Sequence, residues 1–142
     1  MMIDQQMNAS RTLPLLTRMS KLIYRRSSEE LLGMSMRHYV ALAYLRDVEH
    51  APQQLMCEIF GVDANNMVLL LNALEAAGYV ARIRDPADRR RHLVELTDAG
   101  RAALERAEIA QGAIEDEILG ARSAPERATL RELLARALAG QR

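Results

Sequence analysis

The sequence predicts a mainly α-helical chain that carries one small β-hairpin near its middle. Apolar residues recur at three- and four-residue spacing along most of the chain, which is typical of amphipathic helices. A short link at 61–63 that contains glycine joins two of the predicted helices. Two runs with β-type alternation, 79–84 and 92–96, flank an Asp-Pro turn that begins at Asp85. Together these observations indicate helices on both sides of a hairpin.

Length and composition limit the class of protein. The chain has 142 residues, of which 49% are hydrophobic and 27% are charged, so we expect one globular unit with a substantial core. The single cysteine, Cys57, excludes an intramolecular disulfide framework and fits a reducing compartment. The three histidines have no metal-ligand spacing with this cysteine, and we expect neither a metal ion nor a cofactor.

The sequence gives no sign of a membrane protein. Its N-terminal residues are polar and do not resemble a secretory signal. The longest unbroken apolar run, Met67–Leu71, is far too short to span a bilayer. We therefore expect a soluble, cytoplasmic protein without membrane contact.

The N-terminal part predicts two helices. The first begins near Ser10 or Thr12, either of which would cap it, and it runs to Gly33. The second covers about 36–47, and Ser35 is its expected cap. Neither helix carries a pattern that indicates catalysis.

The next segment predicts a helix-turn-helix. A connector at 49–51 precedes a third helix over about 52–60. A fourth helix over about 64–77 follows, with Asp63 as an acidic N-cap and Gly78 as a left-handed stop. Two helices joined by so tight a link form the helix-turn-helix pattern.

The fourth helix has two faces of different character. Its buried stripe is expected to consist of Met67, Leu70, Leu71 and Leu74. The opposite face and its flanks carry Asn65, Asn66, Val68, Leu69, Asn72 and Ala76. Asparagine can contact adenine through two hydrogen bonds in a DNA major groove, and apolar side chains can contact thymine methyl groups. In the alternative interpretation, the asparagines only help to cap the helix and Leu69 packs on a partner.

The turn of the hairpin is strongly basic. Residues 82–92 hold five arginines against Asp85 and Asp88, a net charge of +3, whereas the whole chain is neutral. A basic hairpin directly after a recognition-type helix predicts a winged helix-turn-helix whose wing contacts a polyanion, with arginine entering a DNA minor groove. Asp88 is expected to orient the guanidinium group of Arg90. The alternative is a solvated charged loop. The wing residues predicted to contact DNA are Arg84, Asp88, Arg89, Arg90 and Arg91.

The C-terminal part predicts two further helices. A long alanine-rich helix over 98–119 follows its cap Thr97, and Gly120 ends it. A last helix begins at a capping box formed by Ser123 and Glu126. Its apolar stripe comprises Leu130, Leu133, Leu134, Ala137 and Leu138.

The terminal helices carry more apolar surface than a small winged domain needs for its core. We expect residues 1–33 and 98–142 to supply dimerisation helices and residues 34–97 to form the winged helix-turn-helix domain. A twofold homodimer presents two recognition helices at a fixed spacing, which suits a pseudo-palindromic operator on double-stranded DNA.

A set of residues around the hairpin resembles the pattern of a known family. The set comprises Leu74 with Glu75, Gly78 to Val80, Arg82, Asp85, Asp88 to Arg90, Leu96 with Thr97, and Gly100. In this combination and spacing the chain resembles the MarR family (multiple antibiotic resistance regulators), and the helix order extends the resemblance over nearly the whole chain. The resemblance implies a homodimeric transcriptional regulator whose fourth helix lies in the major groove, with Arg90 in the minor groove.

The resemblance also implies a mode of regulation. Many members of the family release DNA when a small phenolic or aromatic acid binds between the DNA-binding and dimer regions. By resemblance, Tyr24, His38 and Tyr39 would line that site. Members that sense oxidation carry a cysteine near the start of the first helix, which has none here, and we interpret Cys57 as a small buried hydrophobic residue. We expect a repressor that an aromatic effector releases.

Two other functions compete with this one. Asn65 and Asn66 match positions that small hydroxyl residues usually hold in the family, whereas Val68 and Leu69 stand where a hydroxyl and a basic residue are common. The second hypothesis is therefore a protein-interaction module that docks a partner through this apolar face. The third, an enzyme that uses Cys57 or a histidine, is disfavoured because the sequence shows no nucleophile–base pair, phosphate loop or metal cluster. No catalytic residue is expected.

Overall fold

The computed structural model describes residues 11–141, so the predicted cap Ser10 lies outside the described residues. The helices are α2 (Thr12–Arg26), α3 (Glu29–Leu32), α4 (Met36–Val48), α5 (Gln53–Phe60), α6 (Ala64–Ala76), α7 (Asp98–Leu119) and α8 (Ala124–Ala139), and the strands are β1 (His50–Pro52), β2 (Val80–Arg84) and β3 (His92–Leu96). This confirms the predicted mainly helical fold with a small hairpin. Within the described part, none of the helices combines the length and the apolar character that crossing a membrane requires.

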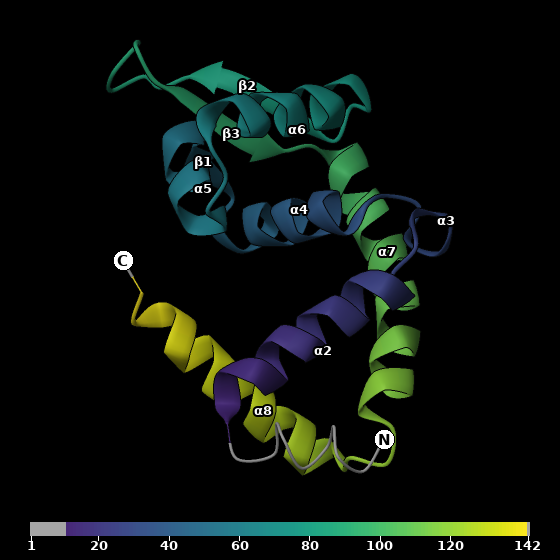
Figure 1. Cartoon of the computed structure of the whole chain (residues 1–142). Coiled ribbons are helices and arrows are strands. Elements are labelled where there is room, and N and C mark those ends of the chain that lie inside the picture. The colour runs from purple at the N-terminus through teal and green to yellow at the C-terminus, as the bar shows by residue number, and fades with distance from the viewer. Residues whose placement is uncertain (1–10, 142) are drawn as a thin grey trace.

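The elements form two regions joined by one long helix. Figure 1 shows the sheet with α4, α5 and α6 at one end of the molecule and α2 and α8 at the other. The N-terminal half of α7 packs against α3 and α4, and the helix then runs down to the corner from which α8 turns back. The hairpin turn projects from the end that is farthest from α2 and α8.

The predicted first helix is interrupted, which corrects the expectation of one helix as far as Gly33. The hydroxyl of Ser28 accepts a hydrogen bond from the backbone N–H of Leu31 at 3.2 Å and starts the short α3. Gly33, with φ of 77°, ends α3. The prediction that Thr12 caps the preceding helix is also wrong, because Arg11 is the N-cap residue of α2 and makes no side-chain capping bond.

Four of the other helices begin where the sequence predicts, and α5, predicted from Pro52, begins one residue later at Gln53. The side chains of four predicted caps each accept a hydrogen bond from the backbone N–H three residues later: Ser35, Asp63, Thr97 and Ser123. Glu126 completes the capping box by accepting a hydrogen bond from the backbone N–H of Ser123 at 2.9 Å. Short-range capping chemistry therefore located these helix starts correctly.

The sheet has a third strand that the sequence did not indicate. The predicted connector at 49–51 lies largely within β1, which pairs antiparallel with β3, so the strand order is β1-β3-β2. Ala51 lies opposite Val94, and Pro52 ends the strand and is the N-cap of α5, which begins at Gln53. Three residues are too few to show a period, and β1 forms because a strand distant in sequence supplies its hydrogen-bond partners.

The predicted hairpin is confirmed with a small correction at its start. β2 pairs antiparallel with β3, from Val80 opposite Leu96 to Arg84 opposite His92. Tyr79, predicted as the first strand residue, precedes the strand. Its carbonyl instead accepts a hydrogen bond from the backbone N–H of Thr97 at 3.0 Å, which holds the base of the hairpin against the start of α7.

One hydrophobic core joins the sheet to the helices around it. Its largest fully buried side chains are Leu42, Leu45, Met56, Met67, Leu71, Leu74, Val94 and Leu104. They come from α4, α5, α6, β3 and α7, so burial fixes α6 relative to the sheet and to the first half of α7. Of the stripe predicted for α6, Leu70 is only partly buried.

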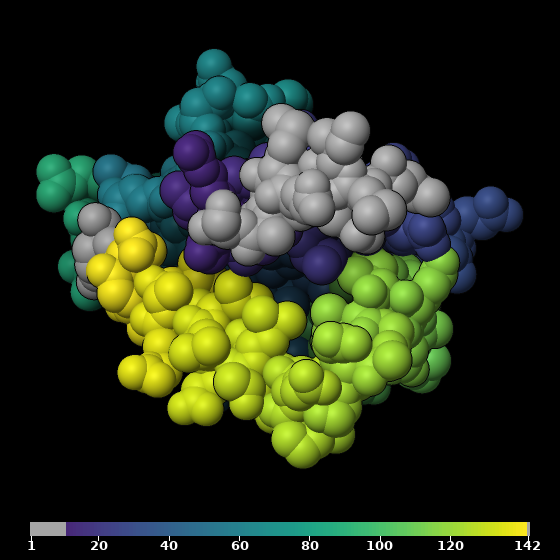
Figure 2. Space-filling model, turned by 60° about the horizontal axis from the view of Figure 1, so that its bottom comes forward, coloured from purple at the N-terminus to yellow at the C-terminus, as the bar shows by residue number. Residues whose placement is uncertain are grey.

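The two terminal helices differ from the rest, because neither α2 nor α8 contains a buried residue. The corner between α7 and α8 is fixed by the guanidinium group of Arg127, which donates to Asp116 at 2.5 Å and to the carbonyls of Gly120 at 3.1 Å and Arg122 at 3.3 Å. Figure 2 shows α8, in yellow, spread across one face of the molecule beside α7, in green. Exposed large apolar side chains on the two helices are Leu13, Leu15, Leu16, Met19, Leu130, Leu133, Leu134 and Leu138.

Candidate nucleic-acid interface

The outer face of α6 carries both polar and apolar side chains, on a helix whose inner face is buried in the core. Met67, Leu71 and Leu74 anchor the inner face in the core. The residues predicted to contact DNA all lie on the exposed side: Asn65, Asn66, Val68, Leu69 and Asn72. Leu69 is 65% exposed and Val68 is 36% exposed, so the apolar part of this face is open in the single chain.

Hydrogen bonds within the hairpin turn give the wing a defined shape. The backbone N–H of Asp85 donates to the carbonyl of Arg91 at 3.0 Å, which closes the turn. Asp88 Oδ1 accepts from both the backbone N–H and the Nε of Arg90, at 3.1 and 3.2 Å. The structure thus places Asp88 beside the Arg90 guanidinium group, as the sequence predicts.

The wing arginines differ in what they contact. Arg90 has a side chain that is 92% exposed, so its positive charge projects into solvent from the turn. Arg84 instead donates to the carbonyl of Arg89 at 2.7 Å, and Arg91 lies 3.8 Å from a carboxylate oxygen of Asp85. Arg84 and Arg91 therefore support the shape of the wing, whereas Arg89 and Arg90 are exposed at the turn and can reach an external anion.

A contact that the sequence did not indicate ties the wing to α6. Arg82 of β2 donates from Nη2 to Asn72 Oδ1 at 2.5 Å and to Glu75 Oε1 at 3.1 Å. The Arg82 side chain is only 19% exposed, and its hydrogen bonds lower the pKa of the Glu75 carboxyl group. In the sequence, Arg82 belongs to the basic segment and to the family pattern, and neither indicates a partner for its side chain. Its partners lie seven and ten residues earlier, on a helix rather than on its own strand, so the period of a single element does not predict the contact.

The base of the wing is closed against α7 at a point where only glycine fits. A Cβ atom on Gly100 would lie 2.1 Å from the carbonyl oxygen of Tyr79. The hydroxyl of Thr97 also donates to the carbonyl of Gly78 at 2.5 Å. Gly100 and Thr97, which both belong to the family pattern, therefore set the position of the hairpin relative to the long helix α7.

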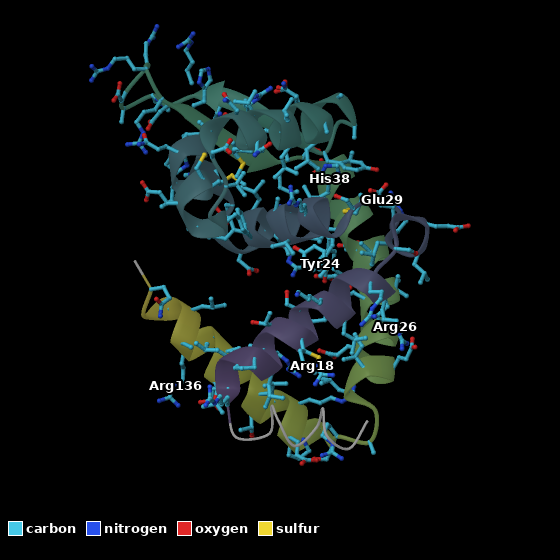
Figure 3. The ribbon with its side chains drawn as sticks, in the orientation of Figure 1. Arg18, Tyr24, Arg26, Glu29, His38 and Arg136 are labelled. Atoms are coloured by element: carbon cyan, nitrogen blue, oxygen red, sulfur yellow. The ribbon has the colours of Figure 1, made fainter. Side chains whose placement is uncertain are left out.

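A cavity of about 520 Å³ lies beside the recognition helix. It is lined from α2 by Tyr24, from the start of α4 by Arg37 and His38, and from α6 by Asn66 and Leu69. Figure 3 shows Tyr24 extending from α2 toward α4, near the end of α4 that carries His38. Further lining residues are Ser35, Val40, Ala41, Phe60, Gly61, Val62 and Leu70. The cavity thus joins a terminal helix to the face predicted to contact DNA.

The three residues predicted to line an effector site are not all in this cavity. Tyr24 and His38 line it, whereas Tyr39 does not. Tyr39 packs against the core near the ion pair of Arg46 and Glu108, and burial together with the Glu108 carboxylate raises the pKa of its phenol. Burial lowers the pKa of His38, and the nearby Glu29 carboxylate opposes that shift.

Cys57 lies on the other side of the domain, beneath the wing. It is partly buried, packs against the core and lines a cavity of about 240 Å³ together with Arg90, Arg91 and His92. The interpretation of a small apolar residue agrees with its packing, although its burial is incomplete. Among residues 11–141, no group of three or more histidine, cysteine or acidic side chains is arranged to hold a metal ion.

Comparison with known proteins places the chain in a family. The model of the MarR family matches residues 32–91. The uncharacterized HTH-type transcriptional regulator YdgJ of Bacillus subtilis is 32% identical over 108 residues, which cover 76% of this chain and 66% of the length of that protein.

Solved structures with the same fold cover more of the chain. A probable transcriptional regulator from Pseudomonas aeruginosa is 30% identical, covers 92% of this chain and 99% of its own, and superposes with a TM-score of 0.71. A cysteine-to-serine mutant of MarR from E. coli, crystallised with operator DNA, is 26% identical over 88% of this chain and 91% of its own, with a TM-score of 0.72. With the wing, the recognition helix and these matches, the chain belongs to the MarR family of winged helix-turn-helix transcriptional regulators.

Proposed function

We propose that this protein is a homodimeric repressor that binds a pseudo-palindromic operator on double-stranded DNA and releases it when a small aromatic acid binds. In this proposal α6 lies in the major groove and Arg90 enters the adjacent minor groove. The observation that carries it is the combination of an exposed asparagine face on α6 with an arginine that is 92% exposed and braced by Asp88. The operator-bound E. coli relative with the same fold supports it.

The apolar surface of the terminal helices supports the homodimer. Leu133 is 55% exposed and Leu138 is 71% exposed, although both belong to the apolar stripe of α8. Contiguous apolar surface of this kind marks an interface in a soluble protein. A second copy packed on α2 and α8 would bury it and would hold the two α6 helices at a fixed separation.

The cavity beside α6 supports an aromatic acid as effector. Tyr24, Phe60 and Leu69 offer apolar contacts to a ring, and Arg37 offers a cation to a carboxylate. The cavity is bounded both by α2 and by α6. An occupant would therefore contact a predicted dimer helix and the predicted DNA-reading helix at once, which couples the two binding events.

Fluorescence anisotropy of the protein with the duplex that flanks its own gene tests this function. We expect binding that exceeds binding to a scrambled duplex and that weakens steeply with salt, because phosphate neutralisation releases counterions. Benzoate added to the complex should lower the anisotropy, and the Arg37→Ala variant should need more benzoate for the same effect. If the complex forms but benzoate does not lower its anisotropy, the DNA-binding function stands and the proposed effector is wrong.

The exposure of Val68 and Leu69 favours one second candidate, a protein-docking module. An apolar protein contact would show little dependence on salt, in contrast to phosphate contacts. Flat anisotropy with every duplex at low salt would therefore favour this second function over the first.

A further inference from the structure

We propose that the three asparagines of α6 read different hydrogen-bond patterns, because neighbouring side chains fix two of their amides in opposite senses. Asn72 presents an amino group that no side chain occupies, Asn66 presents a carbonyl that no side chain occupies, and Asn65 presents both groups unoccupied. The inference rests on the proposed function, in which α6 lies in the major groove. It narrows the sequence-based interpretation, in which each asparagine was an equal candidate for contact with adenine.

Arg82 determines the orientation of the Asn72 amide. Its Nη2 donates to Asn72 Oδ1 at 2.5 Å. A guanidinium group carries only donors, so the partner atom must be the amide oxygen, and the amino group must point away. Glu75 holds the guanidinium in place through Oε1 at 3.1 Å from Nη2 and Oε2 at 3.4 Å from Nε. Turning the Asn72 amide over would place two donors against each other.

Asp63 determines the orientation of the Asn66 amide in the opposite sense. Asp63 Oδ2 accepts from Asn66 Nδ2 at 3.0 Å, while its Oδ1 accepts from the Asn66 backbone N–H at 2.8 Å. An ionised carboxylate carries only acceptors, so the amino group faces Asp63 and the carbonyl is the end of the amide that Asp63 does not hold. The N-cap of α6 thus also sets the polarity of one predicted reading group.

Asn65 has neither constraint. Within the part of the chain that the structure describes, its side chain is exposed and makes no hydrogen bond. It keeps a donor and an acceptor side by side, which is the pattern that matches N7 and the N6 amino group of adenine.

The base edges then distinguish the three positions. A lone amino group suits the O6 and N7 acceptors of guanine, the O4 of thymine and the N7 of adenine, but it finds no acceptor on cytosine, whose major-groove group is the N4 donor. A lone carbonyl suits the N4 donor of cytosine or the N6 donor of adenine. We therefore assign acceptor recognition to Asn72, donor recognition to Asn66 and adenine recognition to Asn65.

Selection of bound sequences from a randomised duplex tests the assignment. Asn72→Asp replaces the amino group by an oxygen while still accepting from Arg82, so the preferred base should change from guanine or thymine to one that carries an amino donor, cytosine or adenine. Arg82→Met frees the Asn72 amide to turn, so the two-bond contact with N7 and N6 of adenine becomes available, and the relative affinity for adenine at that base pair should rise about tenfold. Asn65→Ala should remove the preference for adenine at another base pair.

Arg106→Met is the matched control, because it removes an exposed arginine of α7 outside the predicted interface. It should leave every base preference unchanged. Thermal unfolding checks that Arg82→Met is folded, and Asn72→Asp gives an independent test, because it retains the Arg82 contact. The assignment is overturned if both variants bind DNA with the base preferences of the unmodified protein. If the unmodified protein binds no duplex, the proposed function fails first, and the assignment fails with it.

Discussion

The winged region and the terminal helices use apolar residues in opposite ways. In the winged region, Met67 and Leu71 of α6 are fully buried within a single chain. In the terminal region, Leu134 of α8 is 39% exposed and Leu13 of α2 is 74% exposed, and neither helix buries a residue. Both helices α6 and α8 nevertheless carry leucines at helical spacing. The winged region therefore completes its core alone, whereas the terminal region presents surface that one chain does not cover.

This difference separates two tasks in the proposed repressor. The shape of the DNA-contacting surface is set within one chain, by the core and by the contacts of Arg82 and Asp88. The distance between two such surfaces would be set by the partner packed on α2 and α8. Arg127 fixes the corner between α7 and α8. It therefore sets the direction of α8 and, with it, the position of the proposed dimer surface relative to the winged region.

The largest effect should come from the buried stripe of α6. Leu71→Ala should lower the free energy of unfolding by about 2–5 kcal/mol, because it leaves a cavity in a closely packed core. Leu69→Ala is the matched control on the same helix and should change stability by less than about 0.5 kcal/mol, because Leu69 is 65% exposed. Urea unfolding followed by circular dichroism measures both. Equal losses for the two variants would contradict the different roles of the two faces.

The next largest effect should come from the apolar stripe of α8. Leu134→Glu should convert dimer to monomer in sedimentation velocity at micromolar concentration, because a carboxylate would be desolvated in the interface. The circular dichroism spectrum should remain helical, since the winged core lies elsewhere. Ala128→Glu adds the same charge on the opposite face of α8 and should leave the dimer intact. A monomeric unmodified protein would refute the proposed dimer outright.

Local chemistry made much of the fold predictable. Capping residues such as Asp63 and Ser123 located helix starts, and glycine with Asp-Pro located turns. The break between α2 and α3 was missed because the helical spacing continued through it. The start of α3 depends on one capping side chain, that of Ser28. β1 was missed because three residues show no period and pair with a strand far along the chain.

The candidate site was predictable from the sequence only where its contacts are local along the chain. The pairing of Asp88 with Arg90 spans two residues and follows from sequence, as does the outward face of α6. The Arg82 contact with Asn72 and the cavity between α2 and α6 depend on how distant elements pack, so neither has a local signal. Tyr39 was placed with the effector-site residues by resemblance, but it packs toward the core instead of lining the cavity.

A smaller effect is expected at the wing. Arg90→Ala should weaken operator binding about tenfold and reduce the salt slope by about one, because one phosphate or minor-groove contact is lost. Stability and dimer formation should not change, since the side chain is 92% exposed. Arg106→Ala removes an equally charged group from α7 and should not alter affinity. Anisotropy titrations at several salt concentrations provide the measurement, and unchanged affinity of the Arg90 variant would exclude its role in the wing.

The smallest effect should occur where the two regions meet, at His38. Burial holds the pKa of His38 below its unfolded value of 6.5. The unfolded chain therefore binds a proton more readily than the folded chain in the window below pH 6.5, so this residue contributes full stability above 6.5 and loses it as the pH falls through that window.

His38→Gln should remove this part of the pH dependence, which urea unfolding at about pH 7.5 and about pH 5.5 would detect as a smaller difference than in the unmodified protein.

Glu29→Gln should act the other way, because the Glu29 carboxylate raises the pKa of His38 and so partly offsets the effect of burial. Without that carboxylate, the pKa of His38 should fall further, and the loss of stability on acidification should extend to lower pH. Tyr24 of α2 lines the same cavity as His38. A Tyr24→Ala variant should admit more water to this cavity and so bring the pKa of His38 closer to its unfolded value. If the Tyr24→Ala variant keeps the pH dependence of the unmodified protein, α2 does not control the environment of His38.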